Sequence, residues 1–365
     1  MTGTLRVAVI GATGNVGTEV VRALSADPDV DSVLGIARRM PVDWFPQKVS
    51  WTTADIAEGD LTALFRGADA VVHLAWAIQP SRDARTLYRI NVLGSRNVFA
   101  SAVAAGVPSL VYASSVGAYG PGPRPAAPDD PVDESWPVTG IRSSFYSRHK
   151  AEVERALDEL QADHPALRVV RMRPALVFRH GAGSEVRRLF LGPLFPNALL
   201  RRGLVPVVPA IRGLRFQCVH GEDVADAYRR AVVSDAAGAF NLAADPVLRI
   251  EDQVAGLLGA RPFSVSPRAA RAAVDLTWRS HLQPTPPGWL DMGMQAPLLR
   301  SDRARAELGW EPRVTATEAL ADVLRGLREG ADDPTPPLRH DAGGPGRIGE
   351  LASGLGRGPG PDRPA

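Results

Sequence analysis

The feature that most constrains the fold of this chain is a glycine-spaced turn that follows a short apolar run near the N-terminus. The run is Val7-Ala8-Val9-Ile10, and the turn is Gly11-Ala12-Thr13-Gly14-Asn15-Val16-Gly17. The first glycine lets the chain leave a buried strand sharply, the second lets the backbone approach phosphates, and the third lets the next helix pack close to the sheet. The N-terminus of that helix presents N–H groups to an anion. The turn therefore predicts a strand-turn-helix unit that holds a pyrophosphate.

Strand-like and helix-like segments alternate from residue 5 to about residue 175. Short runs rich in Val, Leu and Ile suit strands that are buried on both faces; they lie at residues 5–10, 32–37, 70–75, 110–114 and 167–172, with a weaker one at 48–51. Helices are expected at residues 16–25, 60–66, 85–105 and 145–163. This order predicts an α/β fold with a doubly wound parallel sheet that binds its ligands at the carboxyl ends of the strands.

The alternation stops after Pro174, and the composition then divides the rest of the chain. We expect residues 1–178 to form a dinucleotide-binding domain to which residues 216–245 return. Residues 179–215 and 246–330 then form a smaller, helix-rich substrate lobe. The tail at residues 331–365 holds 8 Gly and 7 Pro without an aromatic residue, so it is expected to be disordered.

Composition excludes several classes of function. The 42 basic and 40 acidic residues give a net charge of +2, which favours neither a nucleic acid nor a membrane surface as partner. The single cysteine, Cys218, excludes a disulfide within the chain, and the seven histidines lack the spacing of metal ligands. Without a secretory signal or an apolar run near the ~20 residues that span a bilayer, a soluble cytoplasmic protein acting on a small molecule is expected.

A second motif, Tyr146-Ser147-Arg148-His149-Lys150, supplies candidate catalytic groups. Tyr146 and Lys150 are four residues apart in an expected helix, so their side chains share one face. The unperturbed pKa of tyrosine is about 10, and a neighbouring ammonium group is expected to lower it, so that the phenol exchanges a proton with a substrate. Ser115 follows the strand that begins near Leu110, where its hydroxyl would stabilise charge on the same substrate oxygen.

With these motifs in this order, the chain resembles the extended short-chain dehydrogenase/reductase family, in its NAD-dependent epimerase/dehydratase-like branch. The resemblance covers about residues 5 to 325 and implies a Rossmann-type sheet. Further matching pieces are Asp69-Ala70-Val71-Val72-His73-Leu74-Ala75, Asn91 to Val98, Met172-Arg173-Pro174, Val219-His220, Phe240-Asn241-Leu242 and Glu307 to Pro312.

The resemblance also implies roles for individual residues. Ser115, Tyr146 and Lys150 would be catalytic, with Tyr146 and Lys150 also at the nicotinamide end of the cofactor. The remaining cofactor contacts would be Gly11, Thr13, Gly14, Asn15, Val16 and Gly17 in the turn, Asp55 and Ile56 at the adenine, Leu74, Ala75 and Trp76 along the cleft, and Pro174 against the nicotinamide. Asn91 is either a catalytic part or a polar helix residue that bonds backbone. The family also suggests a homodimer formed by the helices at residues 85–105 and 145–163.

The choice of cofactor and reaction rests on a few positions. Arg38 and Arg39 stand after the second strand where NAD sites usually carry a carboxylate, which favours NADP, with NAD as the alternative. Ser114-Ser115 replaces the Thr-Asp-Glu of family dehydratases, so a reductase or dehydrogenase of a hydroxyl/carbonyl pair leads. Arg215 keeps open a sugar-nucleotide epimerase with tightly bound NAD, and arginines of residues 179–216 are candidates to grip an anionic substrate. A regulator that only senses NADP is disfavoured by the Tyr/Lys pair.

Overall fold

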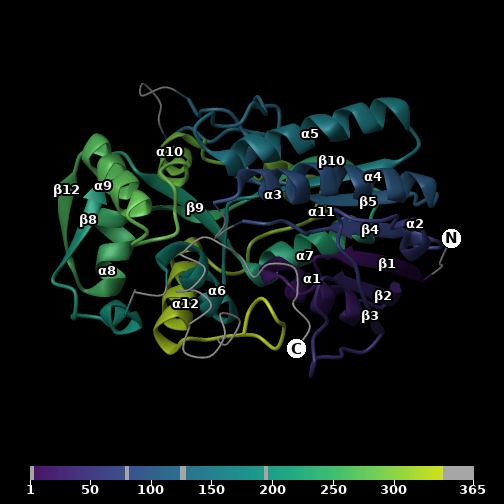
Figure 1. The fold of residues 1–365 in the computed structure, drawn as a ribbon, viewed down its shortest axis with the longest axis horizontal. Coiled ribbons are helices and arrows are strands. Elements are labelled where there is room, and N and C mark those ends of the chain that lie inside the picture. Colours follow the sequence, from purple (N-terminus) through teal and green to yellow (C-terminus); the bar gives the residue numbers. More distant parts are fainter. Residues whose placement is uncertain (1–3, 79–81, 124–128, 193–195, 340–365) are drawn as a thin grey trace.

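A seven-stranded parallel sheet forms the centre of the molecule, with strand order β10-β6-β5-β4-β1-β2-β3 (Figure 1). The computed structural model describes residues 4–78, 82–123, 129–192 and 196–339. The strands are β1 (Leu5–Ile10), β2 (Val30–Ala37), β3 (Val49–Thr53), β4 (Ala70–His73), β5 (Ser109–Ala113), β6 (Arg168–Pro174) and β10 (Gly238–Leu242). The doubly wound parallel sheet predicted from the alternating pattern is thus confirmed.

Helices cover both faces of this sheet (Figure 1). One face carries α3 (Ala84–Tyr88), α4 (Gly94–Ala104) and α5 (Phe145–Asp163), and the other carries α1 (Asn15–Ala26) and α7 (Gly221–Val232). A π-helical turn at Arg89–Leu93 joins α3 to α4, and the short α2 (Thr62–Phe65) and α11 (Asp302–Leu308) complete the layers. The predicted helix at residues 85–105 therefore consists of three consecutive pieces, whereas the one at 145–163 has the predicted ends.

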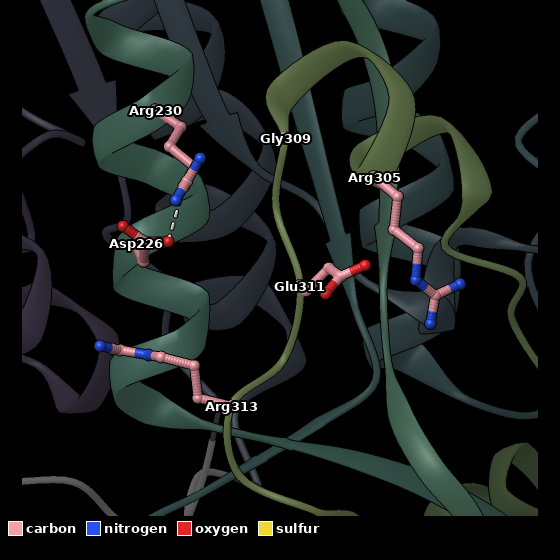
Figure 2. A pocket seen from close by; sticks show the side chains of 6 residues that line it. All are labelled: Asp226, Arg230, Arg305, Gly309, Glu311 and Arg313. Atoms are coloured by element: carbon pink, nitrogen blue, oxygen red, sulfur yellow. Dashed lines mark hydrogen bonds and ion pairs between the residues drawn. The ribbon is translucent and has the colours of Figure 1, made fainter.

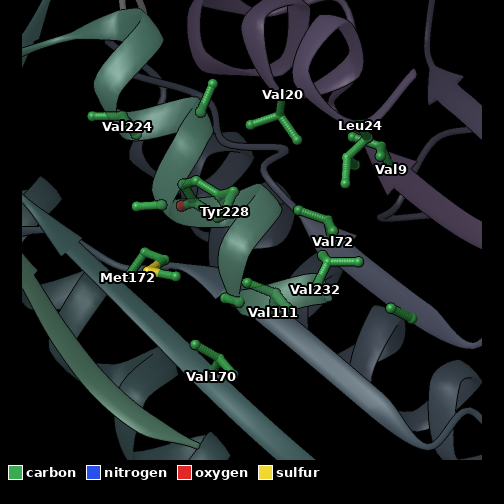
Figure 3. Close-up of a cluster of buried hydrophobic side chains, with 14 of the residues drawn as sticks. Val9, Val20, Leu24, Val72, Val111, Val170, Met172, Val224, Tyr228 and Val232 are labelled. Atoms are coloured by element: carbon green, nitrogen blue, oxygen red, sulfur yellow. The ribbon is translucent and has the colours of Figure 1, made fainter. Parts of the chain in front are cut away.

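The sheet is buried on both faces because consecutive residues of its strands are apolar. Val7 and Val9 of β1 join the cluster with α1 and α7, whose members Val20, Leu24 and Tyr228 appear in Figure 3. Ala8 and Ile10 point the other way and join the cluster under α4 and α5. Strands with several consecutive apolar residues suit a sheet between two helical layers, which is why the pattern predicts the architecture.

The remaining elements form a second lobe beyond the carboxyl ends of the strands (Figure 1). It contains a three-stranded sheet of β7 (Leu176–Phe178), β9 (Arg215–His220) and β11 (Ala244–Arg249), and a pair of β8 (Val207–Ile211) and β12 (Arg261–Val265). Its helices are α6 (Gly183–Val186), α8 (Ala255–Leu258), α9 (Pro267–Arg279), α10 (Gly288–Gln295) and α12 (Ala316–Glu329), with single turns at His180–Ala182, Arg187–Leu191, Asn197–Leu200 and Ile250–Val254. A further single turn, Val116–Ala118, follows β5 in the main domain and packs against α5.

Two segments differ from the expected organisation. Of the return segment at residues 216–245, α7 and β10 rejoin the main domain, whereas β9 pairs with β7 and β11 outside the main sheet. Residues 331–339 were expected in the disordered tail, but they pack on the fold because Asp333, Thr335 and Leu338 are buried there. Residues 340–365 lie outside the described residues. Within the described part, no helix is both long and apolar enough to cross a membrane.

Candidate active site

The glycine-rich turn has the geometry that a bound pyrophosphate requires. Gly11 has a φ of +80°, and a Cβ on it would lie 2.5 Å from the backbone nitrogen of Ala75. A Cβ on Gly17 would lie 2.1 Å from the carbonyl oxygen of Gly11, so the close approach of α1 to the turn depends on glycine. Gly14 is the N-cap of α1 and gives the first turn no side-chain hydrogen bond. These residues therefore fit a dinucleotide, whose phosphates would lie at the N-terminus of α1.

The other expected cofactor contacts lie at the carboxyl edge of the sheet. Arg38 is exposed directly after β2, and Leu74, Ala75 and Trp76 follow β4, the strand on the other side of β1. Asp55 and Ile56 follow β3; the Asp55 carboxylate accepts a bond from the N–H of Ala57, and Ile56 is buried in the α4 cluster. Pro174 ends β6. The parallel sheet brings these residues to one edge, although they are far apart in the chain.

Ser115, Tyr146 and Lys150 meet at the end of β5. The Lys150 Nζ donates to the carbonyl oxygen of Ala113 at 2.6 Å, which fixes α5 to the last residue of the strand. Ser115 follows, and its hydroxyl accepts the N–H of Gly117 at 3.0 Å and is near enough to the Tyr146 hydroxyl to favour a lower pKa of Tyr146. Ser144 caps α5 by accepting the N–H of Ser147, and this cap sets where the Tyr146–Lys150 turn begins.

The electrostatics of this pair correct one expectation. We expected the Lys150 amine to make the phenol more acidic, but burial raises the pKa of Tyr146 to about 12, and only the hydrogen bond from Ser115 opposes this. Burial also lowers the pKa of Lys150 well below its usual value, against the attraction of Glu154. The Lys150 Nζ lies 5.8 Å from the centroid of the Tyr146 ring and 3.5 Å from that of Trp76. For this pair, removal from water therefore outweighs the charge of the amine.

Aromatic rings surround Tyr146 from two domains. The Trp76 ring lies 5.9 Å away edge-on, and the ring of Trp289 in α10 lies 4.9 Å away. Phe190 packs edge-on against Trp289 at 5.2 Å. Among the described residues, the indole N–H groups of Trp76 and Trp289 are buried without a hydrogen-bond partner. The sequence reasoning missed Trp289, which stands in a Pro-Pro-Gly-Trp stretch with no periodic signal.

A buried network of charges supports the strand end behind Ser115. The Glu154 carboxylate accepts bonds from Arg173 at 2.8 and 2.9 Å, from Arg171 at 3.0 Å and from the Ser114 hydroxyl at 2.5 Å. Burial alone would raise the pKa of Glu154, but the bonds and charges of Arg173 and Arg171 hold it below its usual value. Through Glu154, the network therefore links α5 to β6 and to Ser114, the residue after β5 and directly before Ser115.

Two other residues singled out in the sequence have internal partners. The Asn91 side chain accepts the N–H of Ala77 at 2.7 Å and donates to the carbonyl oxygen of Ala77 at 2.8 Å. Of the two roles considered for Asn91, the structure thus shows the hydrogen bonding to backbone. Arg215 pairs with Asp129 at 3.0 Å.

Among the described residues, no group of three or more His, Cys, Asp and Glu side chains is placed to hold a metal ion.

A hollow between α7 and the chain around α11 is separate from these residues. Figure 2 shows its lining, in which Asp226 pairs with Arg230 at 2.7 Å. The other lining residues are Arg305, Gly309, Glu311 and Arg313. None of the expected catalytic or cofactor residues lines this hollow, so it plays no part in the candidate site.

The parallel sheet between two helical layers, with a second lobe beyond the carboxyl ends of its strands, is a Rossmann-type fold. The family model described as "NAD dependent epimerase/dehydratase family" matches residues 7–243, and the chain belongs to this family. The chain is 28% identical over 351 residues to a UDP-glucose 4-epimerase of Mycolicibacterium smegmatis, covering 89% of this chain and 99% of the relative. It is 37% identical over 111 residues to an L-arabinose 1-dehydrogenase (NAD(P)(+)) of Haloferax volcanii, covering 30% and 41%.

A solved structure with the same fold is the UDP-glucose 4-epimerase of Thermus thermophilus in complex with NAD. It matches with a TM-score of 0.63 and 23% identity over 89% of this chain and 99% of that chain. Since the relatives include an epimerase and a dehydrogenase, membership of the family leaves the reaction of this chain to be argued from its own residues.

Proposed function

We propose that the protein is an NADP(H)-dependent oxidoreductase that transfers hydride between the nicotinamide and the hydroxyl or carbonyl carbon of a small molecule. The observation that supports this most is the grouping of Ser115, Tyr146 and Lys150 at the end of β5. The cofactor supplies or accepts the hydride. Every other step in the proposal belongs to side chains of this chain.

In the direction of carbonyl reduction, the Tyr146 hydroxyl gives its proton to the substrate oxygen as the carbon receives hydride. Since the pKa of Tyr146 is about 12, the phenol is protonated at neutral pH and ready to donate. The Ser115 hydroxyl donates to the same oxygen and stabilises the charge that develops there. Lys150, held by the Ala113 carbonyl, faces the resulting phenolate from inside the fold.

NADP is proposed over NAD because Arg38 is exposed at the carboxyl end of β2, with no carboxylate at that point. A guanidinium group donates well to a 2′-phosphate. Titration with NADPH and NADH tests this choice, and tighter binding of NADH would contradict it.

The substrate is proposed to bind in the lobe formed by residues 179–215 and 246–330, because this lobe carries Phe190 and Trp289 near Tyr146. The family resemblance also suggests a homodimer, and light scattering tests that.

The test of the mechanism is Tyr146→Phe, compared with Tyr88→Phe. Tyr88 donates to Glu152 on the exposed side of α5, so its hydroxyl serves as a control for loss of a phenol. We expect Tyr146→Phe to lower turnover at least about 100-fold, the usual contribution of general acid catalysis, while nucleotide affinity is nearly retained. Full activity of Tyr146→Phe on any carbonyl substrate that the wild type reduces would refute the mechanism.

The second candidate is a sugar-nucleotide epimerase with resident NAD. It is favoured by the near full-length match to a UDP-glucose 4-epimerase and by Arg215 at the start of β9. Denaturing the purified protein and identifying the released nucleotide separates the two functions. Stoichiometric NAD would favour the epimerase, and a protein free of nucleotide that binds NADPH on addition would favour the oxidoreductase.

A further inference from the structure

The C-terminal segment, residues 331–339, is built into the fold by specific contacts. The helix α12 ends at Gly330, which has a φ of +65°, and the chain then turns toward α1 (Figure 1). The Ser184 N–H donates to the carbonyl oxygen of Ala331 at 2.9 Å, and Arg188 donates to that of Pro337 at 2.6 Å. Leu338 is fully buried. The segment therefore has a defined position against residues 184–188 of the second lobe.

This segment reaches the glycine-rich turn itself. The Thr335 hydroxyl donates to the carbonyl oxygen of Thr13 at 2.8 Å, in the middle of the turn, and Thr335 is fully buried. Two residues earlier, the Asp333 carboxylate pairs with Arg179 at 2.5 Å and with Arg22 at 2.6 Å. The Asp333 side chain is only 5% exposed, so these two arginines stand in for its lost water.

Arg179 is the residue that connects Asp333 to the phosphate-binding helix. Its Nε donates to the Asn15 side chain at 2.8 Å, and another nitrogen donates to the Thr18 hydroxyl at 2.8 Å, both in the first turn of α1. It also pairs with Glu19 at 2.9 Å. Arg179 is thus a buried guanidinium beside the N-terminus of α1, the end of a helix that favours an anion.

The charges of this group balance while the C-terminal segment is docked. Arg22 and Arg179 are matched by Glu19 and Asp333. An added pyrophosphate would then meet the repulsion of Asp333 without a positive charge left over. When Asp333 leaves, one positive charge is gained beside the turn, and Arg179 can donate to a phosphate oxygen in place of the carboxylate.

We propose that Arg179 is a phosphate-binding residue of the cofactor site and that Asp333 of the C-terminal segment takes its place when no nucleotide is bound. This proposal rests on the proposed function only in requiring a dinucleotide at the turn. The C-terminal segment then restrains nucleotide binding, and nucleotide displaces Asp333 from Arg179. The role of Arg179 thus differs from the substrate contact for which the arginines of residues 179–216 were candidates.

The test compares NADPH affinity, measured by direct binding without turnover, for Asp333→Asn and Glu329→Gln. Glu329 lies at the end of α12 and pairs with His180 at 2.7 Å. Its variant therefore also removes one negative charge, but from a carboxylate that does not contact the arginines beside the glycine-rich turn. We expect Asp333→Asn to bind NADPH about three- to tenfold more tightly, with a smaller gain at high salt, and Glu329→Gln to match the wild type. Arg179→Met should bind about tenfold more weakly, and adding Asp333→Asn to it should give a smaller gain than Asp333→Asn gives in the wild type, because no Arg179 remains to be released.

Hydrogen exchange of the wild-type chain gives a second measurement that does not depend on a variant folding. Saturating NADPH is expected to speed exchange of the amides in residues 331–339, including those of Leu338 and Arg339 that bond to the Thr335 carbonyl. Slower exchange there, or weaker NADPH binding by a folded Asp333→Asn, would overturn the proposal and make the segment part of the closed cofactor site. Because neither measurement needs a substrate, an inactive protein that binds NADPH would contradict the proposed function alone.

Discussion

Replacing Glu154 by Gln tests the buried charge network under the candidate site. The Glu154 side chain is 1% exposed and accepts both the bidentate bonds of Arg173 and a bond from Arg171. After the substitution, Arg171 keeps its pair with Asp158 at 2.6 Å, so the loss falls mainly on Arg173. Arg173 loses its charged partner and keeps neutral ones, among them the hydroxyl of Tyr119 and the carbonyl of Glu134.

Removing one partner of a buried ion pair lowers the free energy of unfolding by about 3–5 kcal/mol. Because Arg173 retains neutral hydrogen-bond partners, we expect a loss of about 3 kcal/mol for Glu154→Gln. That is a large part of the ~5–15 kcal/mol by which proteins are stable. Glu159→Gln is the matched control, because Glu159 lies on the same helix and pairs with Arg96, but the two side chains are 62% and 46% exposed. An exposed pair of this kind is worth at most about 1 kcal/mol.

The measurement is urea unfolding of both variants, in which the midpoint of Glu154→Gln falls while the slope is unchanged. Adding Arg173→Met to Glu154→Gln should destabilise less than the sum of the two single changes, because both charges are then gone. Equal midpoints for Glu154→Gln and Glu159→Gln would refute the reasoning. The pH dependence has a definite sign: since the pKa of Glu154 is depressed in the fold, its contribution is present above about pH 4.3 and disappears as pH falls through the folded pKa.

Two further predictions concern the turn and the sheet. Gly17→Ala places a Cβ 2.1 Å from the Gly11 carbonyl oxygen, so NADPH binding should be lost, whereas Gly256→Ala in α8, with no atom within 4 Å, should bind normally; titration of both variants checks this. Burial, assisted by the charge of Lys150, lowers the pKa of His73 to about 3, so the imidazole is neutral in the fold. The free energy of unfolding should therefore fall by up to about 1.4 kcal/mol per pH unit as pH drops below about 6.5, and less steeply in His73→Gln; identical slopes in urea unfolding would contradict a buried neutral imidazole.

The main sheet was predictable because its signal is local. Strands such as β1 are apolar at successive positions, and several such runs alternating with helices are typical of a sheet between two helical layers. The ends of α5 were predictable for the same kind of reason, since Ser144 is a good N-cap immediately before Phe145. Boundaries were less accurate where no cap or turn marks them, as at β3, which begins and ends later than expected.

The grouping of the candidate site followed from topology, but its surroundings did not. Once β5 and α5 are placed, Ser115 and Lys150 must meet at the carboxyl edge of the sheet. Trp289 reaches Tyr146 from α10, more than 140 positions along the chain, and no pattern in the sequence predicts that contact. The docking of residues 331–339 depends in the same way on single long-range partners. A tail rich in Gly and Pro is disordered on average, but Asp333 lies opposite two arginines and is held there.

The error about the acidity of Tyr146 arose because a motif gives spacing along a helix but not the distance to water. A spacing of four residues in a helix places Lys150 near Tyr146. The attraction between ammonium and phenolate was therefore expected to determine the pKa of Tyr146. In the fold, the same helix face is pressed against β5 and covered by Trp76, so burial acts on both groups at once. Burial disfavours every charged form, which raises the pKa of the phenol and lowers that of the amine. The pair is thus shifted toward its neutral state, and a positively charged nicotinamide beside it would lower the pKa of Tyr146 because it favours the phenolate.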